Sequence, residues 1–175
     1  VRVRAAFEAV TAPENRFILR LMGDLRECRV LDLGSGLGEA AVYFALRGAR
    51  VTATDISPEM CALARETGRR HGVEIEAIAT PVERLDVPAG SFDVVYGANL
   101  LHHVADVDGT LAAVRRALRP GGRCFFWDPL AYNPVINLYR RMATSVRTPD
   151  EHPLDFGVLR VFGRHFTLVR HREFW

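Results

Sequence analysis

Short apolar runs alternate with longer amphipathic stretches along most of the chain. The apolar runs, each bounded by turn residues, occupy 29–33, 50–54, 73–79, 92–97 and 123–127. Runs of four to seven residues are typical of buried strands, and strands that alternate with helices pair in parallel through right-handed crossovers. The pattern therefore predicts an α/β fold with a doubly wound, mostly parallel sheet.

The stretches between the runs carry apolar residues at helical spacing. This spacing predicts helices over 38–47, 57–71 and 107–118. The sequence Ser57-Pro58-Glu59 combines a hydroxyl cap, a proline at the first helical position and an acid in the first turn, which together mark a helix start. Glycines at 48 and 72 follow two of these stretches and are typical helix ends.

The two ends of the chain depart from this alternation. Helical spacing at 3–10 and 14–25 predicts two helices before the first strand. Beyond Asp128 we expect helices at 134–144 and 155–162 and a weak strand at 167–175. We therefore expect a single domain over 1–175, whose three parts are N-terminal helices at 1–28, a binding core at 29–128, and lid helices with a final strand at 129–175.

Composition limits the class of protein. The chain has 175 residues, 49% of them hydrophobic, which suffices for one core. No apolar stretch reaches the length of a membrane span, although peripheral contact with a membrane surface remains open. The formal net charge is +2, and all 23 basic residues are arginines interleaved with 21 acids, which argues against a nucleic-acid partner. The three cysteines have no C-x-x-C spacing, so we expect buried thiols in a reducing cytoplasm.

Residue types typical of a ligand site cluster at the end of the first predicted strand. Residues 30–38 read V-L-D-L-G-S-G-L-G, an apolar run followed by three glycines, and the next strand ends in Asp55. Glycines let the backbone approach a ligand closely, and a carboxylate at a strand tip accepts hydrogen bonds from two ribose hydroxyls. The segment therefore predicts a site for an adenosine-containing ligand.

The glycine spacing separates two classes of adenosine ligand. A dinucleotide loop has G-x-G-x-x-G, but Glu39 occupies the position of its third glycine. An acid in the first helical turn repels a pyrophosphate, and Asp32 adds a second carboxyl nearby. The loop thus favours S-adenosylmethionine, which carries positive charge on its sulfonium and amino groups.

Four motifs resemble those of the class I (Rossmann-like) S-adenosylmethionine-dependent methyltransferases, in particular the group acting on small molecules and quinones. They read V-L-D-L-G-S-G-L-G, T-D-I-S-P-E-M, S-F-D-V-V-Y-G-A-N-L-L-H-H-V and L-R-P-G-G-R, and they span about residues 29–128. The resemblance implies seven strands, the last two forming an antiparallel hairpin. Six strands can be placed in the sequence, so we expect the last strand to be missing from this chain.

The resemblance also implies which residues bind the cofactor. Asp32 organises the turn and the methionine amino group, and Asp55 holds the ribose. Ile56 packs on the adenine or belongs to the core. The adenine edge, where relatives often have an acid, falls to Thr80 or Val82. The full set of implied cofactor residues is Asp32, Gly34, Ser35, Gly36, Gly38, Asp55, Ile56, Thr80, Val82, Asn99 and Leu100, the last two facing the methionine portion and the methyl group.

Acceptor-side residues are less well defined. His102 and His103 are the candidates for a base or a substrate contact, because imidazole titrates near neutral pH, and wall packing is the alternative for both. Asp128 lies at a strand tip, where a structural role is equally open. A substrate lid is predicted from Tyr132, Tyr139, Arg140, Arg141, Arg147 and His152, with a solvated helix as its alternative.

The resulting prediction is an enzyme that moves the methyl group of S-adenosylmethionine to a small, aromatic or lipophilic acceptor by in-line displacement, leaving S-adenosylhomocysteine. Two alternatives stay open at this point. One is a catalytically silent S-adenosylmethionine-binding module or partner subunit, and the other is a dehydrogenase with an atypical glycine loop. No metal-ligand cluster, Ser-His-Asp arrangement or G-K-[ST] phosphate loop occurs in the sequence, which argues against a hydrolase and against a nucleotide triphosphatase.

Overall fold

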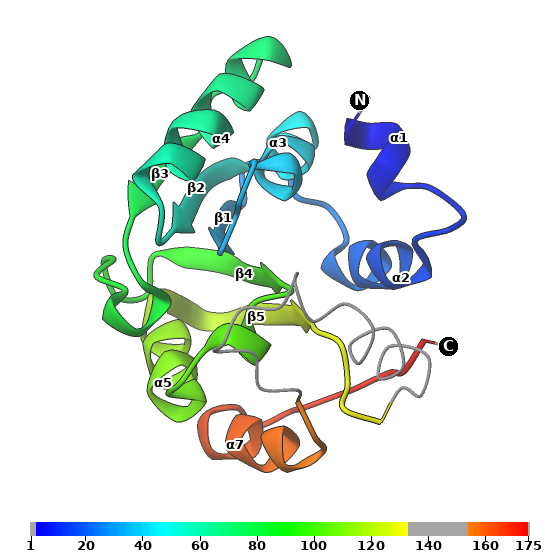
Figure 1. The fold of residues 1–175 in the computed structure, drawn as a ribbon, viewed down its shortest axis with the longest axis vertical. Helices are drawn as coiled ribbons and strands as arrows, with labels where there is room; N and C mark the ends of the chain where they lie inside the picture. The colour runs from blue at the N-terminus through cyan, green and yellow to red at the C-terminus, as the bar shows by residue number, and fades with distance from the viewer. Residues whose placement is uncertain (1–2, 133–153, 175) are drawn as a thin grey trace, which may run out of the picture.

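A five-stranded parallel sheet forms the centre of the protein (Figure 1), in a computed structural model that describes residues 3–132 and 154–174. The strands are β1 (Arg29–Leu33), β2 (Arg50–Asp55), β3 (Glu76–Ala79), β4 (Phe92–Ala98) and β5 (Leu118–Trp127). Their order is β3-β2-β1-β4-β5, and every neighbouring pair is parallel. The predicted doubly wound parallel fold is confirmed.

Helices cover both faces of the sheet, because alternate strand residues point to opposite sides. On one face, Val30 of β1 belongs to an apolar cluster with α1 (Val3–Phe7), α2 (Pro13–Met22) and α3 (Glu39–Leu46). On the other face, the neighbouring Leu31 packs with α5 (Val107–Ala117). Two helices complete these layers: α4 (Pro58–Arg70) lies against β2 and β3, and α7 (Gly157–His165) against α5.

Two strands begin at residues other than those predicted from the sequence. β3 begins at Glu76 rather than Val73, because the Val73 N–H donates to the Gly68 carbonyl oxygen (3.0 Å) in the turn that ends α4. β5 begins at Leu118, directly after α5, and its register against β4 shifts between Phe92 and Val94. The Pro-Gly-Gly sequence in this stretch accommodates such an irregularity.

The C-terminal segment corrects a further expectation. The helix predicted at 155–162 is present as α7, but the strand predicted at 167–175 is wrong for 167–174, the residues described there. These residues pack by side chains instead: the Phe174 ring lies 5.8 Å from the Phe17 ring of α2, and the Arg172 guanidinium 4.9 Å from the same ring. The helix predicted at 134–144 falls outside the described residues.

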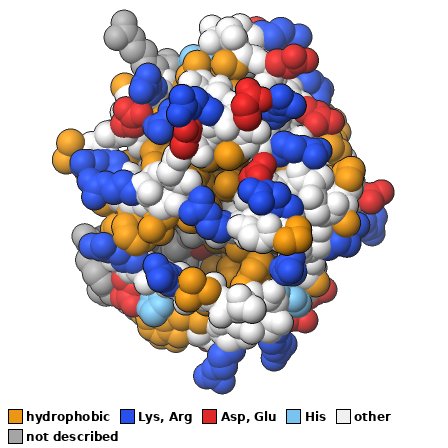
Figure 2. Space-filling model, turned by 180° about the vertical axis from the view of Figure 1, so that it is seen from behind, with side chains coloured by type: hydrophobic (Ala, Val, Ile, Leu, Met, Phe, Trp, Pro, Cys, Tyr) orange, Lys and Arg blue, Asp and Glu red, His pale blue; other side chains and the backbone are white. Residues whose placement is uncertain are grey.

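Charged side chains on this surface are interspersed rather than gathered into patches of one sign. Figure 2 shows basic and acidic side chains interspersed over the face seen there. Several pairs are close in sequence, such as Glu66 with Arg69 and Arg70, at 2.8 and 2.9 Å. This distribution agrees with the balanced composition and stabilises the surface only weakly.

Candidate functional site

The glycine turn joins β1 to α3 at the carboxyl edge of the sheet. Gly34, Gly36 and Gly38 all have positive φ, at 64°, 50° and 77°. A Cβ atom on Gly38 would lie 2.7 Å from the Ala64 Cα and Cβ atoms of α4, and one on Gly34 would lie 2.9 Å from the Leu100 Cδ1 atom. The turn therefore needs glycine both for its backbone angles and for its close packing.

Asp55, at the tip of β2, holds the turn from the neighbouring strand. Its Oδ2 atom accepts a hydrogen bond from the Gly36 N–H (2.9 Å), and its Oδ1 atom accepts one from the Ser57 N–H (3.0 Å). Ser57 in turn caps α4, because its Oγ atom accepts from the Met60 N–H (3.2 Å) as the sequence predicts. Asp55 thus joins the turn to the start of α4 and stays partly exposed at the strand tip.

Asp32 lies beneath the turn rather than in it. Its side chain is buried, and burial raises the pKa of this carboxyl to about 8, with a smaller upward contribution from Asp55 and a downward one from the Ala41 N–H. Its Oδ2 atom has no hydrogen-bond partner among the described residues. Burial therefore favours the protonated form of Asp32, whereas the sequence pattern predicts a second anion at this position.

The residues predicted at the adenine lie beside Asp55 but play different parts. Ile56 is 73% exposed, so the core role that the sequence left open does not hold. Val82 is buried in the apolar cluster with Leu85. The Thr80 N–H donates to the Asp55 carbonyl oxygen (2.8 Å), while its hydroxyl donates to nearby backbone carbonyls. Of these residues, Ile56 offers the free apolar surface.

Asn99 and Leu100 follow β4 and face the turn from the other side. Asn99 has a φ of 52°, a left-handed conformation that asparagine tolerates better than most residues, and its N–H donates to the Trp127 carbonyl oxygen (2.7 Å). Strained backbone of this kind gathers at functional sites. The Leu100 side chain is the one that approaches Gly34.

The two histidines differ in their surroundings. They belong to the short 3₁₀ helix η2 (Leu101–His103), with ring centroids 4.0 Å apart. The His102 ring is buried, and its Nδ1 atom lies 2.8 Å from Oδ1 of Asp128, directly after β5. His103 is exposed. The sequence predicts either histidine as a base or a substrate contact. In the structure, His102 is the one that forms a buried pair with Asp128.

That pair was not predicted from the sequence, although both residues were named as candidates. A signal was present, because His102 and Asp128 follow the adjacent parallel strands β4 and β5, whose carboxyl ends share one edge. Of the predicted lid, Tyr132 stacks on Phe156 of the segment before α7, with centroids 5.3 Å apart. The other predicted lid residues lie outside the described residues: Tyr139, Arg140, Arg141, Arg147 and His152.

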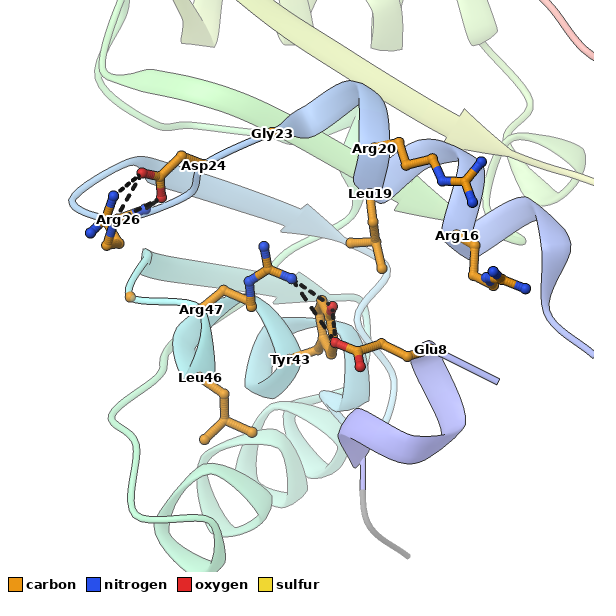
Figure 3. A pocket seen from close by; sticks show the side chains of 11 residues that line it. Glu8, Arg16, Leu19, Arg20, Gly23, Asp24, Arg26, Tyr43, Leu46 and Arg47 are labelled. Carbon is orange, nitrogen blue, oxygen red and sulfur yellow. Dashed lines mark hydrogen bonds and ion pairs between the residues drawn. The ribbon is translucent and has the colours of Figure 1, made fainter. Parts of the chain in front are cut away.

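A separate groove of about 1060 Å³ lies between α1, α2 and α3 (Figure 3). It reaches the loops before β1 and β2, so it opens at the edge opposite the glycine turn. The Tyr43 hydroxyl donates to Glu8 (2.9 Å) and accepts from Arg47 (3.1 Å), and Asp24 pairs with Arg26 (2.6 Å). This groove contains none of the predicted site residues.

Three further features of the described residues bear on their chemistry. Within 3–132 and 154–174, no group of three or more His, Cys, Asp or Glu side chains is placed to hold a metal ion. None of the helices there combines the length and apolar character needed to cross a membrane. The three cysteines, Cys28, Cys61 and Cys124, are free thiols.

Known proteins were compared with the chain. A family model described as a methyltransferase domain matches residues 31–126. A ubiquinone biosynthesis O-methyltransferase of Bordetella avium is 38% identical over 124 residues, which are 70% of this chain and 51% of that protein. The chain thus spans about half the length of the curated relatives it matches.

Solved structures give the same picture. An S-adenosylmethionine-dependent methyltransferase from Mesorhizobium loti is 31% identical, with a TM-score of 0.60 over 71% of this chain and 55% of that one. The YcgJ protein of Bacillus subtilis is 25% identical, with a TM-score of 0.74 over 86% of this chain and 66% of that one.

Proposed function

This chain belongs to the methyltransferase-domain family, and on that premise we propose that it transfers a methyl group from S-adenosylmethionine to a small-molecule acceptor. Membership confirms the resemblance drawn from the four sequence motifs. The observation that carries the proposal is the Asp55 carboxylate fixed to the Gly36 N–H at the tip of β2, a geometry that presents an acceptor for a ribose beside a backbone open to close approach.

The residues present fit an S-adenosyl ligand. Asp55 would hold the ribose, and the exposed Ile56 side chain offers an apolar face to the adenine. The Oδ2 atom of Asp32 is buried beneath the turn without a partner among the described residues, and a cationic group bound above it would favour the ionised form of this carboxyl. When bound, S-adenosylmethionine supplies an activated methyl group.

The contribution of the chain is to bind, orient and exclude water. The close packing of Gly34 against Leu100 fixes the turn relative to the segment after β4. The glycine turn and the segment after β4 both follow strands at the same edge of the sheet. A ligand on the turn therefore faces Asn99 and Leu100. Such positioning and exclusion of water lower the barrier of a displacement by several kcal/mol.

The acceptor we propose is small, aromatic or lipophilic. The names of the relatives point to ubiquinone precursors as substrates of those proteins and to oxygen as the atom methylated. For this chain, the free thiols and the balanced charge support a cytoplasmic small-molecule enzyme with no nucleic-acid substrate.

Incubation with methyl-labelled S-adenosylmethionine and a pool of bacterial metabolites tests the proposal. The expected result is label in a small organic product, lost in an Asp55→Ala variant. Tight binding of S-adenosylhomocysteine with no label transferred to any acceptor would instead favour the silent binding module that the sequence left open.

A further inference from the structure

Two histidine–aspartate pairs occur among the described residues, and they differ in burial. His102 and Asp128 approach to 2.8 Å with side chains that are 8% and 4% exposed. His165 and Asp108 approach to 3.0 Å on the surface between α5 and α7, with side chains that are 18% and 52% exposed. The same chemical pair is thus present once in the interior and once in solvent, where screening weakens it.

Asp128 holds His102 at two points. Its Oδ1 atom accepts a hydrogen bond from the His102 backbone N–H (3.3 Å) and lies 2.8 Å from the ring Nδ1 atom. An ionised carboxylate can only accept, so the ring hydrogen belongs on Nδ1 and the lone pair on Nε2. This arrangement leaves Nε2 as the ring nitrogen that can accept a proton.

The pair lies at the edge of the sheet that carries the glycine turn. His102 is two residues beyond Leu100, whose side chain approaches Gly34, and Asp128 directly follows β5. The second carboxylate oxygen of Asp128 is buried without a partner among the described residues. A buried acceptor left unpaired is costly, which argues against a purely structural pair.

Other titratable groups lie near the pair. The ring of the exposed His103 is tilted by 41° against the His102 ring, with centroids 4.0 Å apart. Burial, followed by the charges of Asp32, Glu14 and Asp128, raises the pKa of Tyr96 on β4, so this phenol stays protonated at neutral pH. Within residues 3–132 and 154–174, Asp128 is the acid that is hydrogen-bonded to the His102 ring.

Resting on the methyl transfer proposed above, we propose that Asp128 is a positioning residue that fixes the tautomer of His102, whose Nε2 atom takes the proton from a hydroxyl acceptor. As the acceptor oxygen bonds to the methyl carbon, its O–H proton moves to Nε2 and the electron pair of the breaking C–S bond stays on sulfur. The imidazolium then returns its proton to water, and Asp128 stays ionised throughout. The acceptor class is thereby narrowed to alcohols and phenols.

The first test reads the tautomer directly. In protein labelled with ¹⁵N at histidine, with and without S-adenosylhomocysteine, we expect His102 to carry its hydrogen on Nδ1. Asp128→Asn should shift the ring toward the Nε2–H form, while Asp108→Asn on the surface should leave the His102 signals unchanged. An Nε2–H ring in the unaltered protein would overturn the proposal.

The second test separates proton transfer from packing. Catechol and 4-nitrocatechol serve as acceptors, because the nitro group acidifies the hydroxyl and reduces the need for a base. With catechol, Asp128→Asn and His102→Gln should each lower kcat about 100-fold or more with little change in KM for S-adenosylmethionine. With 4-nitrocatechol the loss should be at least about tenfold smaller, and Asp108→Asn should match the unaltered enzyme with both acceptors.

Three outcomes would each contradict a different step of the proposal. Equal losses with both acceptors would make the pair structural. Protein that binds S-adenosylhomocysteine but methylates neither compound would refute the hydroxyl acceptor while leaving the methyl-donor site intact. Failure of the unaltered protein to bind S-adenosylhomocysteine would refute the proposed function itself. If Asp128→Asn does not fold, as judged by thermal melting, His102→Gln carries the same comparison.

Discussion

The two edges of the sheet differ in how completely their acidic groups are paired. At the amino edge, the groove between α1, α2 and α3 is large, but its two acids are paired: Glu8 with Tyr43 and Asp24 with Arg26. At the carboxyl edge, unpaired acidic groups occur without a groove of that size. There Asp32 and Asp128 each keep a buried oxygen without a partner among the described residues.

This difference indicates which features mark a site. A groove whose acids are already paired has no free carboxylate to offer a cationic ligand. Buried acceptors without partners and left-handed backbone at Asn99 are costly, and proteins retain such features mainly where a function needs them. We therefore place the proposed function at the carboxyl edge rather than in the groove.

The largest expected effect breaks the glycine turn. Gly38→Ala forces a left-handed residue into a site where its Cβ would meet Ala64 at 2.7 Å, and should lower the free energy of unfolding by about 2–4 kcal/mol. Gly72→Ala is the matched control, since it has a φ of 71° but no atom within 4 Å, and should cost only about 1–2 kcal/mol. Urea titration measures both, and equal losses would show that the close approach to α4 contributes nothing.

A second prediction concerns pH and Asp32. An acid whose pKa is raised on folding, here to about 8 by burial, contributes stability that is fully present below about pH 4 and is lost as the pH rises through 8. The free energy of unfolding should therefore fall by about 1.4 kcal/mol per pH unit between pH 5 and pH 8 and level off above pH 8. Asp32→Asn should remove most of that fall, as urea titrations at several pH values would show.

Asp24, in the groove, provides the opposite case. Its hydrogen bonds to Arg26 lower the pKa of its carboxyl to about 2, so it is ionised in both states over the same pH range. Asp24→Asn should leave the slope of stability against pH unchanged. If Asp24→Asn flattened the slope of stability against pH and Asp32→Asn did not, the unpaired acid would lie at the amino edge instead of the carboxyl edge.

The third prediction sharpens the comparison through ligand binding. Asp55→Ala removes the carboxylate that we assign to the ribose and should weaken the binding of S-adenosylhomocysteine by about 1–3 kcal/mol, or about 5- to 150-fold. Asp24→Ala should leave the affinity unchanged. Isothermal calorimetry measures both variants, and an unchanged affinity in Asp55→Ala would move the ribose contact elsewhere.

The smallest effect is expected in the groove. Tyr43→Phe removes the hydroxyl between Glu8 and Arg47 and should lower the free energy of unfolding by about 0.5–1.5 kcal/mol. The affinity for S-adenosylhomocysteine should not change. A large loss of binding in this variant, at normal stability, would mean that the groove takes part in the site.

Local features of the fold were predictable from the sequence because neighbouring residues determine them. The Ser57 cap, the start of α4 at Pro58 and the positive φ of the three turn glycines all follow from side chains within a few positions. The parallel sheet also followed, since the alternation of strands and helices permits few other arrangements. The sequence also placed Asp55 at the tip of β2, but it did not predict that the Gly36 N–H donates to the Asp55 carboxylate.

What the sequence did not predict depends on contacts between distant segments. Residues 167–174 alternate like a strand, but Phe174 and Arg172 pack on Phe17 of α2, some 150 positions away, and form no ladder. The sequence offered His102 and His103 alike as candidates. In the structure they are distinguished by Asp128, which follows the adjacent strand β5 and pairs with His102. The neutral form of Asp32 follows from complete burial, which no local pattern records.

The central claim is that the turn at 34–38 with Asp55 binds a methyl donor and not a dinucleotide. Calorimetric titration of the unaltered protein with S-adenosylhomocysteine and with NAD, side by side in one buffer, tests it most directly. The account predicts saturable binding of S-adenosylhomocysteine and none of NAD at the same concentrations. Tight binding of NAD without binding of S-adenosylhomocysteine would contradict it and restore the dehydrogenase alternative.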